Sequence, residues 1–255
     1  MAGSLTGWAE KDSEREKLMK NQYVADINDY RKYGLLRTLS GIGKIRTGLC
    51  WMLTPNDDRT DGQFIRYLDS PELWEQYDPP LFRCLADCIQ DGERDVCRIE
   101  SRGILPNTIF HVDLLSDSTQ DRTRYFVDMH ERLQNTDLIF FDPDNGIEIQ
   151  SRPYGRKHSS KFLYWHELNQ AYSAGKSVLV YQHFIREARE NFVTRLSSEF
   201  SRRLAAPEIL SFRTPHVVFF LVSRPEHAKH FEQQAAVVAE QWREQIKVAL
   251  HRQAQ

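Results

Sequence analysis

The sequence has few cysteines, little net charge and no long hydrophobic run. Its four cysteines, at positions 50, 84, 88 and 97 of 255 residues, include no CxxC pair. This usage is typical of reduced thiols in the cytosol rather than of a disulfide framework or a zinc site. The apolar run VVFFLV at 217–222 is far too short to span a bilayer, and the charged first 20 residues lack the apolar core of an export signal. We therefore expect a cytoplasmic protein without a membrane anchor.

The balance of charges limits the function classes. A formal net charge of -2 excludes a protein held on nucleic acid by overall charge alone, although a local basic patch can still bind phosphates. We find no internal repeat, low-complexity tract or Pro/Gly/Ser-rich linker. With 40% hydrophobic residues, the chain suits α/β architecture. We expect an N-terminal extension (1–22), one α/β domain (23–223) and a C-terminal helix (224–255).

Short apolar runs alternate with helical patterns along the domain. A helix capped by Asp26 or Asn28 ends at Gly41 and Gly43, and a helical insertion at 62–92 follows the first strand. The final pair of strands forms a hairpin within 208–223, turning at Thr214 and Pro215. This order predicts a three-layer α/β sandwich with a seven-stranded, mostly parallel sheet. The other strands are expected at 47–53, 95–100 (which equally suits a helix), 108–113, 136–141 and 177–184, and the helices between them at 119–135, 159–176 and 186–204.

Polar side chains follow most of these strands. Asp142, Asp144 and Asn145 come directly after the apolar run LIFF, in the motif DPDNG, and Gln182 with His183 ends the fifth strand. Turns favour such residues, which accounts for each one alone. Because ligands of parallel sheets bind outside the carboxyl ends of the strands, the group as a whole indicates a binding site at one edge.

The strand order with its terminal hairpin, the acids Glu100 and Asp113 after the second and third strands, and the Asp-Pro after the fourth resemble class I S-adenosylmethionine-dependent methyltransferases. Within that class the chain is most similar to the ribosomal RNA adenine methyltransferases of the J type, which also open with a helix like ADINDYRKYGLL. The likeness covers residues 23–223. It implies a 3-2-1-4-5-7-6 type of sheet, S-adenosylmethionine as cofactor, and methyl transfer to an amino group of a nucleic-acid base or nucleotide.

The resemblance also implies residue roles. Glu100 would bind the cofactor's ribose hydroxyls and Asp113 its adenine amino group, because an ionised carboxylate only accepts hydrogen bonds. Asp142 would accept from the target amine and orient its lone pair, with Asn145 assisting. The expected catalytic set is Asp142, Asp144, Asn145 and His183, and the cofactor-binding set is Asp26, Asn28, Asp57, Glu100 and Asp113.

Basic and aromatic residues predict how a substrate is held. The stretch RPYGRKHSSKFLYW follows the DPDNG motif and combines basic side chains with rings, as in loops that grip nucleic acid. It equally suits a solvated loop that leads into a helix. The first helix adds Tyr30 and Lys32 near the same edge. The expected substrate-binding set is therefore Arg152, Arg156, Lys157, Lys161, Tyr30 and Lys32.

Two departures from the methyltransferase pattern favour other functions. The loop TPNDDRTDG has no GxG, and Asp144 with Asn145 replaces a proline and an aromatic residue. One alternative is a phosphodiesterase or nuclease that holds Mg²⁺ or Mn²⁺ with Asp142, Asp144 and acids of the first loop. His183 would then be a base or ligand. A third possibility, after methyl transfer and phosphodiester cleavage, is an inactive, methyltransferase-like binding protein that docks through its tail helix. The alternative metal set is Asp142, Asp144, Asp57 and Asp58, with Asp61 and Glu148 nearby.

Overall fold

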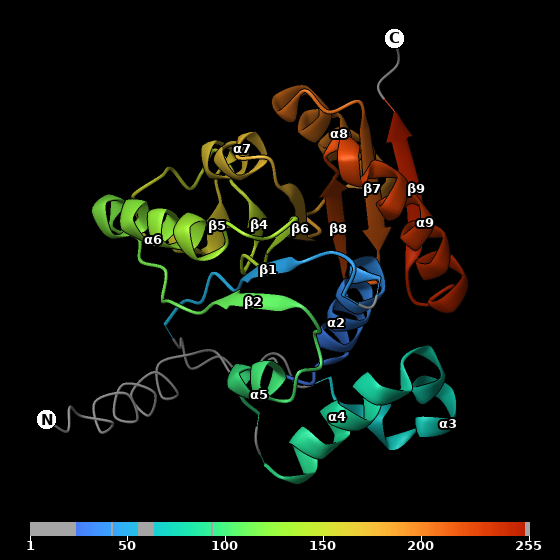
Figure 1. The fold of residues 1–255 in the computed structure, drawn as a ribbon. Coiled ribbons are helices and arrows are strands. Elements are labelled where there is room, and N and C mark those ends of the chain that lie inside the picture. The colour runs from blue at the N-terminus through green and yellow to red at the C-terminus, as the bar shows by residue number, and fades with distance from the viewer. Residues whose placement is uncertain (1–23, 42, 56–63, 93, 253–255) are drawn as a thin grey trace, which may run out of the picture.

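A computed structural model describes residues 24–41, 43–55, 64–92 and 94–252 of the chain. A seven-stranded sheet runs through the middle of the molecule, with helices on both faces (Figure 1). The strand order is β2-β1-β3-β6-β8-β7-β9. A second, two-stranded sheet pairs β4 with β5. The strands are β1 (Thr47–Cys50), β2 (Thr108–His111), β3 (Leu138–Phe141), β4 (Gly146–Ile147), β5 (Phe162–Leu163), β6 (Ser177–His183), β7 (Glu208–Arg213), β8 (Val217–Val222) and β9 (Lys247–Arg252).

The sheet is mixed, which corrects the expectation of a mostly parallel one. The pairs β1–β2, β1–β3 and β3–β6 are parallel. The pairs β6–β8, β7–β8 and β7–β9 are antiparallel. Helices cross over between the parallel strands, whereas a short turn joins β7 to β8. The predicted hairpin at 208–223 is therefore confirmed, and the parallel part is confined to four strands.

Two hydrophobic cores lie on opposite faces of the sheet, as the period-2 alternation of strand side chains requires. Leu49, Phe140 and Leu179 face one core, together with α2 (Ile27–Ser40), α4 (Pro79–Gln90) and α9 (Pro225–Gln241). Ile139 and Val180 face the other, together with α6 (Thr119–Arg132), α7 (Trp165–Ser173) and α8 (Arg189–Leu204). The three-layer α/β arrangement is confirmed.

The segment expected as the second strand is a helix. Residues Val96–Ser101 form α5, and Val96 and Ile99 both enter the first core. Their spacing of three residues places them on one helical face, while only one of them would face that core in a strand. As a result β2, at 108–111, pairs directly with β1. The expected sheet order holds only after the strand expected at 95–100 is removed and β9 is added.

The region before β2 forms a helical cap on the first core. Asp26 caps α2 by accepting from the backbone N–H of Asn28 at 2.8 Å, and Gly41 ends the helix in the left-handed conformation. The described part of the expected helical insertion is helical, and its helices α3 (Pro71–Trp74) and α4 each begin at a proline. Two single-turn helices, η2 (Arg66–Asp69) and η3 (Glu75–Tyr77), complete it.

Two helix boundaries differ from the sequence-based expectation. The tail is not a single helix, because α9 ends at Gln241 and β9 then joins the sheet beside β7. The helix expected at 159–176 starts later, since Ser159 and Ser160 lie in the single turn η4 (Ser159–Lys161) and do not cap it. The helix begins at Trp165, where the Glu167 carboxylate accepts from the backbone N–H of Tyr164 at 2.9 Å. Within the described ranges, no helix is both long and apolar enough to cross a membrane.

Candidate functional site

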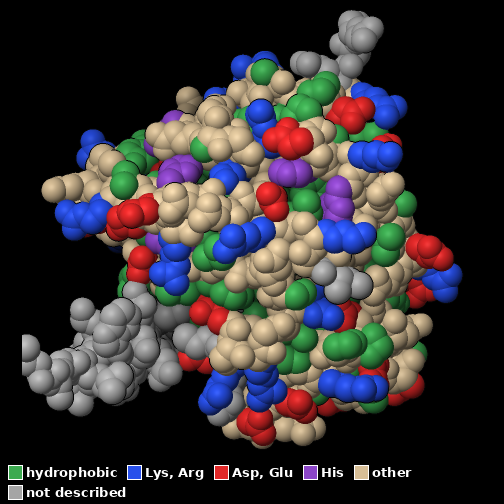
Figure 2. All heavy atoms as spheres, viewed as in Figure 1, with side chains coloured by type: hydrophobic (Ala, Val, Ile, Leu, Met, Phe, Trp, Pro, Cys, Tyr) green, Lys and Arg blue, Asp and Glu red, His purple; other side chains and the backbone are tan. Residues whose placement is uncertain are grey.

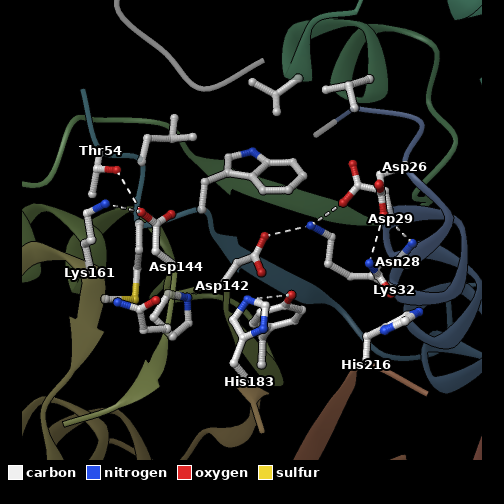
Figure 3. A pocket seen from close by; sticks show the side chains of 18 of the residues that line it. Asp26, Asn28, Asp29, Lys32, Thr54, Asp142, Asp144, Lys161, His183 and His216 are labelled. Carbon is white, nitrogen blue, oxygen red and sulfur yellow. Dashed lines mark hydrogen bonds and ion pairs between the residues drawn. The ribbon is translucent and has the colours of Figure 1, made fainter. Parts of the chain in front are cut away.

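A pocket of about 600 Å³ lies at the carboxyl ends of β1, β3 and β6. Residues after each of these strands reach it, and the first turns of α2 form the opposite wall. The expectation that distant polar residues share one edge therefore holds for this group (Figure 3). The predicted site residues that line the pocket are Asp26, Asn28, Lys32, Asp142, Asp144, Asn145, Lys161 and His183.

The centre of the pocket wall is a lysine shared by two carboxylates. Lys32 Nζ lies 2.7 Å from Asp29 Oδ1 and 2.8 Å from Asp142 Oδ2. The three side chains are only 9%, 7% and 14% exposed, respectively. The ammonium also lies 5.1 Å and 5.4 Å from the ring centres of Tyr33 and Trp51, a cation–π geometry. Figure 3 shows Lys32 reaching from α2 toward Asp142.

Burial and charge set the protonation of this cluster. Burial raises the pKa of Asp29 to about 6 even though Lys32 opposes the shift. Burial also raises the pKa of Asp142, again against the influence of Lys32. For Lys32, burial disfavours the charge, but the attraction of Asp142 and Asp29 outweighs it and raises the pKa. The cluster therefore holds one ammonium and two carboxyl groups at neutral pH.

The Asp142 carboxylate has one oxygen available to a ligand. Its Oδ2 accepts from Lys32, and its backbone N–H donates to Cys50 O at 3.1 Å, which ties it to the end of β1. Among the described residues, no hydrogen bond reaches Oδ1. A carboxylate fixed in this way can accept a further hydrogen bond from a ligand in the pocket.

Asp144 and Asn145 occupy the other side of the pocket. Thr54 Oγ1 donates to Asp144 Oδ2 at 3.2 Å, and Lys161 Nζ lies 3.7 Å from the same oxygen. Asn145 is exposed, and its backbone N–H donates to Lys161 O at 2.9 Å. Figure 3 shows Thr54, Asp144 and Lys161 together, across the pocket from Asp26 and Asn28.

Aromatic rings border the mouth of the pocket. The rings of Phe64 and His216 stack with their centres 6.3 Å apart and their planes 9° apart, and Phe64 is 66% exposed. Tyr181 Oη and His183 Nε2 lie 3.2 Å apart. All four residues line the pocket. These rings can contact a planar ligand, while the carboxylates below them accept hydrogen bonds from it.

The comparisons with known proteins add a likeness of fold. No family model matches the chain, and no curated protein matches it. A solved structure that it resembles is described as the crystal structure of protein LPL1258 from Legionella pneumophila str. Philadelphia 1, family-model DUF519. The match has a TM-score of 0.43 at 8% sequence identity, and it covers 91% of this chain and 98% of that chain.

Of the predicted residues outside the basic loop, Tyr30, Glu100 and Asp113 are described but do not line the pocket. Tyr30 is fully buried, and its hydroxyl donates to Trp74 O at 2.8 Å, so it packs inside the helical cap. Glu100 lies on α5, and its Oε1 accepts from Trp51 Nε1 at 3.0 Å, behind the pocket wall. Asp113 follows β2 with 44% of its side chain exposed. Glu100 and Asp113 are therefore not among the residues that line the pocket around Asp142.

The basic loop after the DPDNG motif is anchored away from the pocket. Arg152, Arg156 and Lys157 are exposed and, unlike Lys161, do not line the pocket. Within this stretch, Tyr164 Oη donates to the backbone oxygen of Arg152 at 2.7 Å. On the face drawn in Figure 2, basic and acidic side chains are spread in patches of both signs. The prediction that these three residues bind substrate stays a prediction.

The alternative metal set is only partly described. Asp57, Asp58 and Asp61 lie outside the described residues. Glu148 Oε1 accepts from the backbone N–H of Trp165 at 3.0 Å and so caps α7 rather than facing the pocket. In the described part of the chain, no three His, Cys, Asp or Glu side chains are grouped so as to hold a metal ion.

The sequence reasoning left out several residues of the site. These are Trp51, Phe64 and His216, which line the pocket. Asp29, the second partner of Lys32, is not one of them, because its spacing from Asp26 and Lys32 already predicts that it points to the same sheet edge. Phe64 and His216 belong to loops that approach each other only in the folded chain, and no local pattern marks them.

Proposed function

We propose that this chain transfers a methyl group from S-adenosylmethionine to an amino group of a nucleic-acid base or nucleotide. The observation that carries the proposal is the Asp142 carboxylate, which Lys32 holds through Oδ2 at the end of β3, in the lining of a pocket. An acceptor fixed in this way can orient a substrate amine before transfer. The order of the strands β2, β1, β3, β6, β8 and β7 agrees with the methyltransferase order apart from one missing strand.

The residues of the site fit the cofactor in size and charge. About 600 Å³ lies within the usual range of about 300–1,000 Å³ for small-molecule pockets. The described lining has four aspartates (26, 29, 142 and 144) against two lysines (32 and 161), which favours a positively charged ligand. Met52, just after β1, takes a φ of 48° and lines the pocket. The cofactor would therefore contact the Met52 side chain at a position where a glycine would have exposed the backbone.

We assign the ribose-binding role to Asp113 instead of Glu100. Asp113 follows β2, the strand that pairs with β1, and this is the position that the resemblance gave to the ribose-binding acid. Glu100 is on a helix and already accepts from Trp51. Isothermal titration with S-adenosylhomocysteine tests the assignment. Asp113→Ala should weaken binding at least about tenfold, the effect of losing about 1.4 kcal/mol, and more than Glu100→Ala does.

The side chains of the pocket orient the substrate amine for the transfer. When bound, the cofactor supplies an electrophilic methyl group on a sulfonium. Asp142 Oδ1 accepts from the amine N–H and so turns the nitrogen lone pair toward that methyl group. Lys32 fixes the orientation of Asp142, while the rings at the mouth hold the base and exclude water. Asn145 lies at the mouth beside Asp144, where its amide can contact the base.

The direct test uses S-adenosylmethionine with a tritiated methyl group and pooled single-stranded RNA, single-stranded DNA and mononucleotides. The wild type should label one of these acceptors. Asp142→Asn should still bind S-adenosylhomocysteine but lose transfer by about 100-fold or more, a typical effect of misplacing a reacting group. Asp128→Asn makes the same chemical change at an exposed position of α6 and should leave transfer unchanged. A chain that binds neither the cofactor nor its product would overturn the proposal.

The same titrations include Mg²⁺ and Mn²⁺. Metal binding that stabilises the wild type but not Asp142→Ala, together with cleavage of the nucleic acid, would favour the phosphodiesterase alternative. Stability that changes with neither the cofactor nor a metal would favour a binding protein without catalytic activity.

A further inference from the structure

Gln182, near the end of β6, contacts the DPDNG segment from inside the protein. The residue is only 4% exposed. Its Oε1 accepts from the backbone N–H of Ile147 at 2.8 Å, and its Nε2 donates to Asn145 O at 3.2 Å and to His183 O at 2.8 Å. One buried amide therefore satisfies three backbone groups in two segments of the site.

Gly146 makes these contacts possible. It takes a φ of 103°, a conformation that residues with a Cβ rarely adopt. A Cβ built at this position would lie 2.3 Å from Gln182 Oε1. The Gln182 amide thus packs directly against the bare α-carbon of Gly146. This geometry requires both Gly146 and Gln182.

The two ends of the DPDNG segment are held by different partners. Asp142 is tied to β1 through its backbone N–H. Asn145 is held through its N–H by Lys161 O and through its C=O by Gln182. Because Gln182 also binds the backbone of His183, it links the two segments that border the pocket at this side.

We infer that Gln182 is a positioning residue, which sets the placement of Asn145 and His183 at the mouth of the pocket without contacting the substrate. The inference rests on the proposed methyl transfer. Its physical basis is that a buried amide with both ends bonded rigidifies the segments it joins, and that displacements of about 1 Å near reacting groups cost about 100-fold in rate.

The experiment compares Gln182→Met with the wild type. In the variant, amide hydrogen exchange at Ile147 should accelerate, since its N–H loses its acceptor. The kcat for methyl transfer, counted per folded molecule, should fall about 100-fold, while the KM for S-adenosylmethionine stays within about threefold. Gln170→Met makes the same change at an exposed position of α7 and should alter none of these quantities.

Gln182→Glu keeps the test decisive if the methionine variant does not fold. It retains an acceptor for Ile147 but sets a carboxylate against the carbonyls of Asn145 and His183. Protonation of the introduced carboxylate restores one hydrogen-bond donor. Methyl transfer by this variant should therefore rise as the pH is lowered, relative to transfer by the wild type. An unchanged kcat in Gln182→Met, or the same pH profile in Gln182→Glu and the wild type, would overturn the inference and leave the proposed function standing. A wild type without transfer would overturn both.

Discussion

Replacing Lys32 with methionine tests the electrostatics of the site most directly. Lys32 Nζ contacts Asp29 at 2.7 Å and Asp142 at 2.8 Å, and all three side chains are largely buried. Methionine keeps most of the length of the side chain but leaves two carboxylates without a counter-charge. Removing one partner of a buried ion pair costs about 3–5 kcal/mol, and we expect a loss of that size in the free energy of unfolding at about pH 7.5.

The loss should depend on pH in a defined direction. Burial already raises the pKa of Asp29 and Asp142, and without Lys32 no ammonium opposes it. The folded variant then binds more protons than the unfolded chain, so its stability falls as the pH rises. At about pH 5 the carboxyl groups can be neutral, and the loss should be smaller than at about pH 7.5 by at least about 1.4 kcal/mol, the value of one pKa unit.

Urea denaturation followed by tryptophan fluorescence measures this at both pH values. Lys229→Met, at an exposed position of α9, is the control and should change stability by no more than about 0.5 kcal/mol. A loss below about 1 kcal/mol for Lys32→Met, or an equal loss at both pH values, would refute the description of a buried, shared ammonium.

Three further predictions concern stability. Arg122→Met should cost about 3–5 kcal/mol, because it leaves the buried Glu167 carboxylate without the guanidinium that lies 2.5 Å away, and adding Glu167→Leu should recover most of this in a double-mutant cycle. Gly34→Ala should destabilise by about 1–3 kcal/mol instead of favouring the helix, since the added Cβ would lie 2.0 Å from the buried Trp242 ring; thermal unfolding shows the sign. Because the pKa of Asp29 is raised from 3.8 to about 6 in the folded chain, the wild type should lose up to about 3 kcal/mol of stability as the pH rises from about 4 to about 6. Asp29→Asn should remove this loss, and a wild-type curve without it would contradict the prediction.

The parts of the fold that could be predicted are those with strong local patterns. The apolar run before Asp142, the hairpin turn at Thr214, and the cap at Asp26 are each found where the sequence indicated. Their side chains alone decide these structures, through burial of successive apolar residues or through a capping hydrogen bond.

The wrong predictions come from segments whose state depends on distant partners. Residues 95–100 alternate like a strand, yet burial of Val96 and Ile99 in the same core selects a helix. None of residues 247–252 is buried, and they carry no strong pattern. They form a strand because β7 offers a complete register from Glu208 to Arg213.

The candidate site also contains residues that could be predicted from local patterns and residues that could not. Asp142, Asn145 and His183 could be placed together because they follow strands that end at one edge. Gln182 belongs to the strand-end group that the sequence indicates, but its inward-facing role could not be predicted, since a polar residue at a strand end usually faces solvent. Only the folded chain brings it against Gly146, where it is 4% exposed.

The terminal strand β9 has a consequence for self-association. It covers β7, in which the four residues from Ile209 to Phe212 are buried. It also places Lys247 and Arg252 at the outer margin of the sheet. Charged side chains on an edge strand discourage pairing with another chain. A variant truncated after Ile246 would instead expose the backbone donors and acceptors of an apolar strand, and it should aggregate at concentrations at which the full chain stays dispersed.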